Sequence, residues 1–271
     1  MPLRIKFGAL LTQCGEPIEN GELIIENGNI LEISSCSGKE SAEATLDLSD
    51  HLLMPGFVNA HCHLSLTALA NKLSPSESFA GWISDLIPLN SALSNEERAN
   101  GIRLGANDMK SSGVTGLADY VADPALLKSI AELGFRSVLF LEIIGFQKDK
   151  ADGLTKEVEA ILKSHDSSWT LGIAPHAPYS VSEKLLRQLD HLSRKYGCLL
   201  STHLAETDEE VQFIDKGEGP LLGLLKDRQA FDESWQAPAT TPSRYLKSIG
   251  ALDDMVAVHC NYIEGDIDDV Q

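Results

Sequence analysis

The feature that most constrains the fold is an alternation of apolar segments with amphipathic segments, repeated from residue 56 onward. Between the apolar segments, apolar residues recur at helical spacing. Strands that alternate with helices of this length form βαβ units and a parallel sheet, whose strands are buried and mostly apolar. The expected strands are GFVNAHCH (56–63), VTGLADY (114–120), RSVLFLEII (136–144), TLGIAPHA (170–177), CLLSTHLA (198–205) and MVAVHC (255–260).

Helices are expected at 95–112, 124–134, 154–165 and 182–197, where the apolar spacing is clearest. Six such strands suit two architectures. A doubly wound sheet can have six strands, whereas a (β/α)₈ barrel needs eight. The segment FDESWQAPATTPSR (231–244) lacks periodicity and predicts a loop excursion after the fifth strand, either a lid or an insertion.

The first 55 residues have a different pattern and predict a small β-sheet unit. Short alternating segments at 4–12, 21–35 and 44–56 are broken by turn residues, which is typical of hairpins. In 21–35, two β-rich arms flank Asn27-Gly28, the dipeptide that two-residue hairpin turns prefer.

Composition excludes several classes of partner. Forty acidic residues against 22 Lys and Arg give a net charge of −18 and no basic cluster, so no nucleic-acid partner is expected. No apolar run reaches the roughly 18 residues that span a bilayer, so no membrane partner is expected. The N-terminus lacks a signal-peptide pattern, and five scattered cysteines indicate reduced thiols. We therefore expect a cytoplasmic protein with a small-molecule substrate.

Polar residues interrupt the apolar strands mainly at their carboxyl ends, where parallel α/β folds carry their chemistry. Five of the eight histidines lie at such ends, and a packing role for all five would need a separate buried partner for each. The five are His61, His63, His176, His203 and His259. The other three are expected to be ordinary surface groups: His51, His165 and His191.

The pair His61 and His63 predicts a metal site. Residues i and i+2 of a strand share a face, so both imidazoles can bind one ion while Cys62 points to the other side. His203 would supply a third ligand from another strand. Neutral imidazoles suit Zn²⁺ or Fe²⁺, and three of them leave a position open for water.

Three further residues have two interpretations each. Glu206, three residues after His203, is either a helix-start carboxylate or the general base for an activated water. His259 is either a further ligand or a group that orients the water and the substrate. His176 lies between two prolines, and we interpret it as a substrate contact, with a metal ligand as the alternative.

Four segments, in this order, resemble the amidohydrolase superfamily in its cytosine-deaminase-like and chlorohydrolase-like branch. They are PGFVNAHCHLSL (55–66), GIAPHAPYSVS (172–182), STHLAET (201–207) and VAVHC (256–260). The resemblance implies a (β/α)₈ barrel and a small β-sandwich domain formed from both chain ends. It also implies one divalent metal ion, Zn²⁺ first and Fe²⁺ second.

The same resemblance implies roles for the residues that match its motifs. His61, His63 and His203 would bind the ion together with an aspartate at the end of strand eight. Glu206 would be the proton shuttle, His259 would orient the hydrolytic water, and His176 would touch the substrate.

Strands seven and eight of that family, with the aspartate, have no counterpart before residue 271. The resemblance therefore implies a C-terminal truncation. Residues 1–55 would be the N-terminal part of the β-sandwich domain, and 56–271 an incomplete barrel of strands one to six. The final EGDIDDVQ (264–271) looks like the start of a helix, and its acidic residues cannot replace the aspartate. We expect this chain alone to be inactive.

The expected reaction is the metal-dependent hydrolytic deamination of a 6-aminopurine nucleoside by an activated water. FAGWISDLIPLN (79–90) resembles the family's lid segment, in which Trp82 and Asn90 are expected substrate contacts. Asn90 stands where adenosine-type deaminases tend to carry a carboxylate for the ribose, which disfavours S-adenosylhomocysteine. The region from 201 to 221 looks more like the aminodeoxyfutalosine deaminases of menaquinone synthesis.

Alternative functions remain open at this point. One is a methylthioadenosine or S-adenosylhomocysteine deaminase. Another is a chlorohydrolase or amidohydrolase on the same scaffold, which would share the metal and the base. A third is an inactive fragment or a non-catalytic paralogue. A homodimer is also compatible with the sequence.

Overall fold

The computed structural model describes residues 2–35, 45–165, 167–251, 253–263 and 265–266. The chain folds into two compact units, Met1–Phe57 and Val58–Gln271. Cys36 and most of the segment 264–271, where the start of a helix is expected, lie outside the described residues.

The first unit is a four-stranded sheet in the order β3-β2-β1-β4, formed by β1 (Leu3–Leu10), β2 (Ile18–Glu26), β3 (Asn29–Ser35) and β4 (Thr45–Leu53). The hairpin between β2 and β3 is confirmed. Asn27 and Gly28 have φ of 50° and 77°, the left-handed pair that a two-residue turn requires. The expectation of a hairpin at 44–56 is wrong, because β4 pairs in parallel with β1, and a parallel pair cannot be joined by a tight turn.

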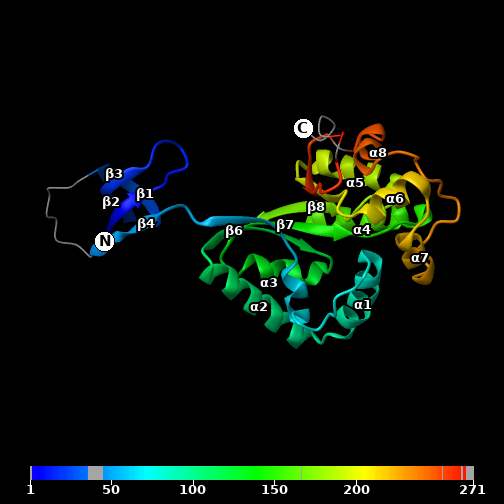
Figure 1. Cartoon of the computed structure of the whole chain (residues 1–271), viewed down its shortest axis with the longest axis horizontal. Coiled ribbons are helices and arrows are strands. Elements are labelled where there is room, and N and C mark those ends of the chain that lie inside the picture. Colours follow the sequence, from blue (N-terminus) through cyan, green and yellow to red (C-terminus); the bar gives the residue numbers. More distant parts are fainter. Residues whose placement is uncertain (1, 36–44, 166, 252, 264, 267–271) are drawn as a thin grey trace. The chain divides into compact units, whose positions relative to one another are not determined.

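The second unit contains six strands that match the six predicted segments. They are β5 (Phe57–Cys62), β6 (Val114–Val121), β7 (Arg136–Ile143), β8 (Thr170–Pro175), β9 (Leu200–Leu204) and β10 (Met255–His259). Their order in the sheet is β10-β9-β8-β7-β6-β5, the order of the chain, and β6 to β10 pair in parallel. Figure 1 shows β6, β7 and β8 side by side. A sequential order is that of a (β/α)₈ barrel, since the order of a doubly wound sheet reverses at a switch point. The fold is therefore the first six strands of such a barrel.

The four predicted helices are present, and the second is shorter than expected because it starts with a 3₁₀ turn. Short helices that the sequence pattern did not single out follow β9. The helical elements are η1 (Leu64–Leu69), α1 (Phe79–Ala92), α2 (Asn95–Ser111), η2 (Pro124–Leu126), α3 (Leu127–Ala131), η3 (Lys148–Lys150), α4 (Ala151–Ser164), α5 (Glu183–Tyr196), α6 (Asp208–Lys216), α7 (Pro220–Asp227) and α8 (Pro242–Ser248). Among the described residues, no helix combines the length and apolar character needed to cross a membrane.

The segment 231–244 packs against other parts of the second unit. Trp235 stacks on Phe213 of α6 with ring centroids 4.6 Å apart, and it lies 5.3 Å from the ring of Phe146. The predicted loop excursion is present, and this aromatic cluster anchors it.

Helix α5 shows how apolar spacing builds the core. Ser182 caps its first turn, and the αL residue Gly197 (φ 64°) ends it. Between them Leu185, Leu189 and Leu192 recur at intervals of three or four and are buried.

Replacing Leu189 with Ala is expected to lower the free energy of unfolding by about 2–5 kcal/mol, because the side chain is fully buried and its loss leaves a cavity. Leu104→Ala is the matched control, since Leu104 is also helical but 62% exposed, and its cost should stay within about 0.5 kcal/mol. Urea unfolding followed by circular dichroism measures both. Equal losses would contradict the assignment of this core.

Candidate active site

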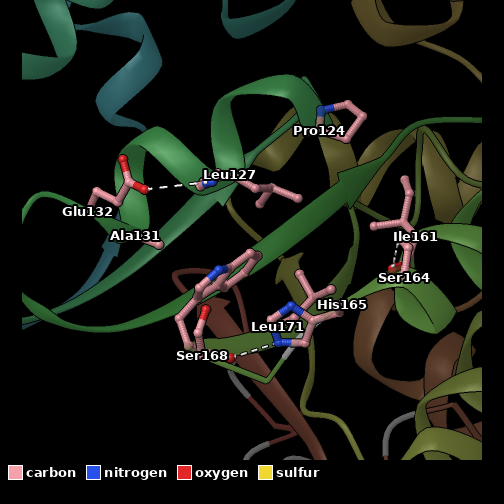
Figure 2. A pocket seen from close by; sticks show the side chains of 11 residues that line it. Pro124, Leu127, Ala131, Glu132, Ile161, Ser164, His165, Ser168 and Leu171 are labelled. Carbon is pink, nitrogen blue, oxygen red and sulfur yellow. Dashed lines mark hydrogen bonds and ion pairs between the residues drawn. The ribbon is translucent and has the colours of Figure 1, made fainter.

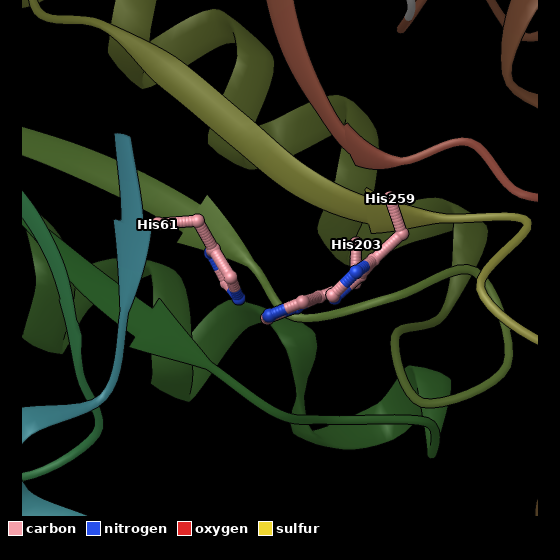
Figure 3. A group of neighbouring side chains, drawn as sticks. All are labelled: His61, His203 and His259. Atoms are coloured by element: carbon pink, nitrogen blue, oxygen red, sulfur yellow. The ribbon is translucent and has the colours of Figure 1, made fainter. Parts of the chain in front are cut away.

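The structure brings the five strand-end histidines together. The ring of His61 lies 5.0 Å from His63, 4.9 Å from His203 and 5.0 Å from His259, measured between centroids. The ring of His176 lies 4.9 Å from that of His203. Figure 3 shows the nitrogens of His61, His203 and His259 pointing toward one another from β5, β9 and β10.

Backbone contacts fix the orientation of two of these rings. His203 donates from Nδ1 to the carbonyl oxygen of His176 at 2.7 Å, which leaves its Nε2 unprotonated when the ring is neutral. His63 makes a hydrogen bond to the backbone of Tyr120. The Nε2 atoms of His63 and His203 face each other at 3.3 Å. Two nitrogen lone pairs this close need a shared proton or a cation, which is the arrangement that metal-ligating histidines adopt.

The electrostatics favour the neutral imidazoles that bind metals. Burial is the main cause that lowers the pKa of His61 and of His63 to about 4, and the neighbouring His63 and His259 contribute to the lowering at His61. Burial, together with the adjacent His176 and His63, lowers the pKa of His203 to about 2. The buried Nδ1 of His61 has no hydrogen-bond partner among the described residues. The donor set therefore fits a divalent metal ion.

Two sets of side chains have ligand atoms within 4.8 Å of one another: His61, His203 and His259, and His63, Glu142 and His203. The predicted set His61, His63 and His203 stays a prediction. His203 shares one of the two sets with His61 and the other with His63, so all three predicted ligands lie at this cluster.

Glu142 is a site residue that the sequence analysis missed. Its side chain is only 7% exposed, and its Oε1 lies 3.9 Å from Nδ1 of His203. That oxygen is buried and has no hydrogen-bond partner among the described residues, and burial raises the pKa of Glu142 to about 7. An acidic residue near the end of the apolar segment RSVLFLEII was the available signal.

Asp119 of β6 is the second residue that the sequence analysis missed, and it binds the residues on either side of His63. Its Oδ1 accepts hydrogen bonds from the backbone N–H of Leu64 at 2.8 Å and from the Cys62 thiol at 3.2 Å. The carboxylate thus holds the residues that flank His63. The side chain is fully buried, and burial raises its pKa to about 6.

Glu206 lies at the start of the loop between β9 and α6. Its Oε1 is 3.5 Å from Nε2 of His259, and burial raises the pKa of the carboxyl group. Three residues of the surrounding turns have left-handed backbones without being glycine: Ala205 (φ 49°), His259 (φ 71°) and Cys260 (φ 54°). Such strain persists only where surrounding contacts hold it, and it is frequent at functional sites.

The three predicted substrate contacts have different surroundings. Nδ1 of His176 lies 2.7 Å from Oγ of Ser180. Trp82 stacks on Phe79 in α1, with centroids 6.0 Å apart. The side-chain oxygen of Asn90 accepts a hydrogen bond from Arg98 at 2.6 Å, so its polar group already has a protein partner.

Two cavities lie away from the histidine cluster. The one in Figure 2 has a volume of about 360 Å³ and is lined by α3, α4 and the start of β8, with Leu127, Ile161 and Leu171 among its residues. A second cavity of about 640 Å³ lies beside Arg187, Trp235 and Tyr245. None of the five clustered histidines lines either cavity.

Residues 52–270 match the amidohydrolase family. Two curated relatives are similar over most of this chain. The 5'-deoxyadenosine deaminase of Methanobrevibacter smithii is 32% identical over 249 residues, which cover 88% of this chain and 52% of the relative. The 5-methylthioadenosine/S-adenosylhomocysteine deaminase of Halothermothrix orenii is 30% identical over 262 residues, which cover 93% and 56%. The chain thus spans about half the length of these relatives.

The solved structure of Helicobacter pylori aminofutalosine deaminase in complex with methylthio-coformycin has the same fold. It superposes with a TM-score of 0.78 at 21% sequence identity, over 94% of this chain and 63% of that one. At this identity the likeness supports the fold.

Replacing Asp119 with Asn is expected to remove a pH dependence of stability. Because the folded-state pKa (about 6) exceeds the ordinary value of 3.8, the native state binds more protons between these two values. The contribution of Asp119 to wild-type stability should therefore fall as pH rises through this window, by an amount on the order of 3 kcal/mol. Asn keeps an acceptor for Leu64 and should remove this part of the fall, whereas Glu142, whose pKa burial also raises, keeps its own contribution.

Urea unfolding at pH 4 and pH 7, with a chelator present, measures the difference between the two proteins. Asp227→Asn, at an exposed position, serves as the control and should follow the wild type. Parallel pH curves for wild type and Asp119→Asn would count against a buried, ionisable Asp119.

Proposed function

The chain belongs to the amidohydrolase family, and we propose that it carries out the metal-dependent hydrolytic deamination of a 6-aminopurine nucleoside. The proposal rests on two groups of side chains that lie at the same edge of the sheet. His63 and His203 direct their Nε2 atoms at each other across 3.3 Å, and the carboxylate of Glu206 lies beside His259 in the turn after β9.

His61, His63 and His203 would hold the metal, with His259 and Glu142 as the nearest additional donors. Three imidazoles make Zn²⁺ the preferred ion, with Fe²⁺ second. When bound, the ion supplies a water molecule of lowered pKa.

The protein's own groups handle the protons and the orientation. In the overall reaction a C6–O bond forms and the C6–N bond breaks, so one proton must move from the water to the departing ammonia. Glu206 can accept that proton from the water and donate it to the leaving nitrogen, and burial raises the pKa of its carboxyl group. His259, at 3.5 Å, orients the carboxylate.

The purine nucleoside is the part of the substrate best supported. The two curated relatives act on 5'-deoxyadenosine and on methylthioadenosine or S-adenosylhomocysteine, and the structural neighbour is an aminofutalosine deaminase. The nucleosides in these names all carry an adenine base. Among them we favour aminodeoxyfutalosine, because Asn90 replaces the carboxylate expected for S-adenosylhomocysteine and its amide is bound by Arg98.

Glu206→Gln is expected to lower kcat by roughly 10²- to 10⁴-fold, because the amide cannot transfer the proton. Bound metal should remain, since Glu206 belongs to neither ligand set. Because this chain alone is expected to be inactive, the rate is measured on the chain extended by the family's strands seven and eight. The adenine-to-hypoxanthine absorbance change on a panel of aminopurine nucleosides reports it, with the exposed Glu132→Gln as the control. The absence of any absorbance change across the whole panel would refute a deaminase.

His203→Ala is expected to abolish stoichiometric metal binding, because His203 belongs to both ligand sets. His191→Ala, which removes an exposed helical histidine, should retain one ion per chain. Metal analysis after dialysis against a weak chelator distinguishes the two variants. Equal metal contents would show that the ion, if present, is held elsewhere.

A further inference from the structure

The start of α6 contains a helix-capping sequence that is used in an unusual way. In a capping box, the side chain of a Ser or Thr accepts from the third helical N–H, and the Glu at that third position reaches back to the N–H of the cap residue. Helix α2 follows this pattern. Ser94 Oγ accepts from Glu97 N at 3.2 Å, and Glu97 Oε2 accepts from Ser94 N at 2.9 Å.

At α6 the first half of the pattern is the same, since Thr207 Oγ1 accepts from Glu210 N at 3.3 Å. The glutamate, however, reaches further back along the chain. Its Oε1 accepts from the N–H of Ala205 and its Oε2 from the N–H of Glu206, each at 3.0 Å. Glu210 is completely buried, whereas the hydrogen bonds of Glu97 are solvent-exposed.

Burying a carboxylate is costly unless donors satisfy it, so a plain helix cap does not explain this placement. The backbone N–H groups of Ala205 and Glu206 supply the donors. The φ of Ala205, 49°, is left-handed, and turns of this kind direct successive N–H groups into one concavity that can receive an acceptor group. The Glu210 carboxylate occupies that concavity.

The carbonyl groups of the same turn are bound from the other side. Leu204 O accepts from Cys260 N at 2.9 Å, and Ala205 O accepts from Tyr262 N at 3.0 Å. Glu206 O accepts from Asn261 Nδ2 at 3.1 Å. Glu206 is therefore held through its N–H by Glu210 and through its carbonyl by the segment after β10.

We propose that Glu210 is a positioning residue for Glu206: its buried carboxylate clamps the two consecutive amides of the strained turn and so keeps the Glu206 carboxylate beside His259. The role of Glu206 in proton transfer rests on the proposed function, whereas the clamp itself rests on the hydrogen bonds. The two can therefore be tested separately.

Hydrogen exchange tests the clamp without any activity. In Glu210→Ala, the amides of Ala205 and Glu206 should exchange at least about 10-fold faster than in the wild type, because both lose their acceptor. Glu210→Gln keeps one acceptor oxygen and should give a smaller increase. Glu97→Ala, the matched cap variant, should affect only the amides near Ser94. Unchanged exchange at 205 and 206 in both Glu210 variants would overturn the proposal.

Kinetics, measured on the chain extended by the family's strands seven and eight, then test whether the clamp acts through Glu206. Glu210→Ala should lower kcat by roughly 10- to 100-fold with little change in KM, because the proton-transferring group is displaced while the substrate still binds. Glu210→Gln should recover part of the loss, and Glu97→Ala should leave kcat unchanged. In a Glu206→Gln background, Glu210→Ala should cause no further loss, since the group it positions is already gone.

If Glu210→Ala lowers kcat by the same factor in the Glu206→Gln background as in the wild type, the positioning role is overturned, because Glu210 then acts independently of Glu206. Metal content should equal that of the wild type in each Glu210 variant, which checks that the histidine cluster is intact. A wild type without deaminase activity that still shows the exchange response would refute the proposed function and retain the clamp.

Discussion

The structure depends on one geometric constraint, that successive parallel strands all end at the same edge of the sheet. Because the strands are almost wholly apolar along their length, polar groups are concentrated at that edge. Five imidazoles and the carboxyl groups of Asp119, Glu142 and Glu206 meet there. Burial disfavours the charged form of these three carboxyl groups and of the imidazoles of His61, His63, His176 and His203. Main-chain groups offset much of that cost. The carbonyl of His176 accepts two hydrogen bonds from His203, and the amide of Leu64 donates to Asp119.

Features that depend on residues close together in the chain could be predicted from the sequence, whereas features that depend on contacts between distant segments could not. Apolar periodicity is local, so it located six strands and four helices, and the strand ends in turn located the histidines. Pairing between distant segments is not local, and the parallel contact of β4 with β1 was missed for that reason. Glu142 and Asp119 were missed because an acidic residue in a strand becomes informative only when its buried neighbours are known. Asn90 was expected to contact the substrate, but the sequence pattern did not reveal that Arg98 donates a hydrogen bond to its side-chain oxygen.

Left-handed residues mark where the chain departs from regular geometry at the site. Ala205 directly follows β9, His259 is the last residue of β10 and Cys260 follows it, so the strain lies in two neighbouring turns. Backbone hydrogen bonds between these turns hold both in place, as the bonds from Cys260 N and Tyr262 N show. A site fixed in this way is organised before a ligand arrives, and less ordering is then needed when one binds.

The two capping sequences carry a consequence for how this protein can vary. Glu97 and Glu210 occupy equivalent positions in similar tetrapeptides, yet one serves only a helix end and the other a turn outside its helix. The partners of Glu210 are main-chain amides, which every residue except proline provides. Any residue other than proline at positions 205 and 206 keeps the two donors, whereas a change at 210 removes their acceptor. The residues that fix the shape of this turn thus lie outside it, in the following helix and in the segment after β10.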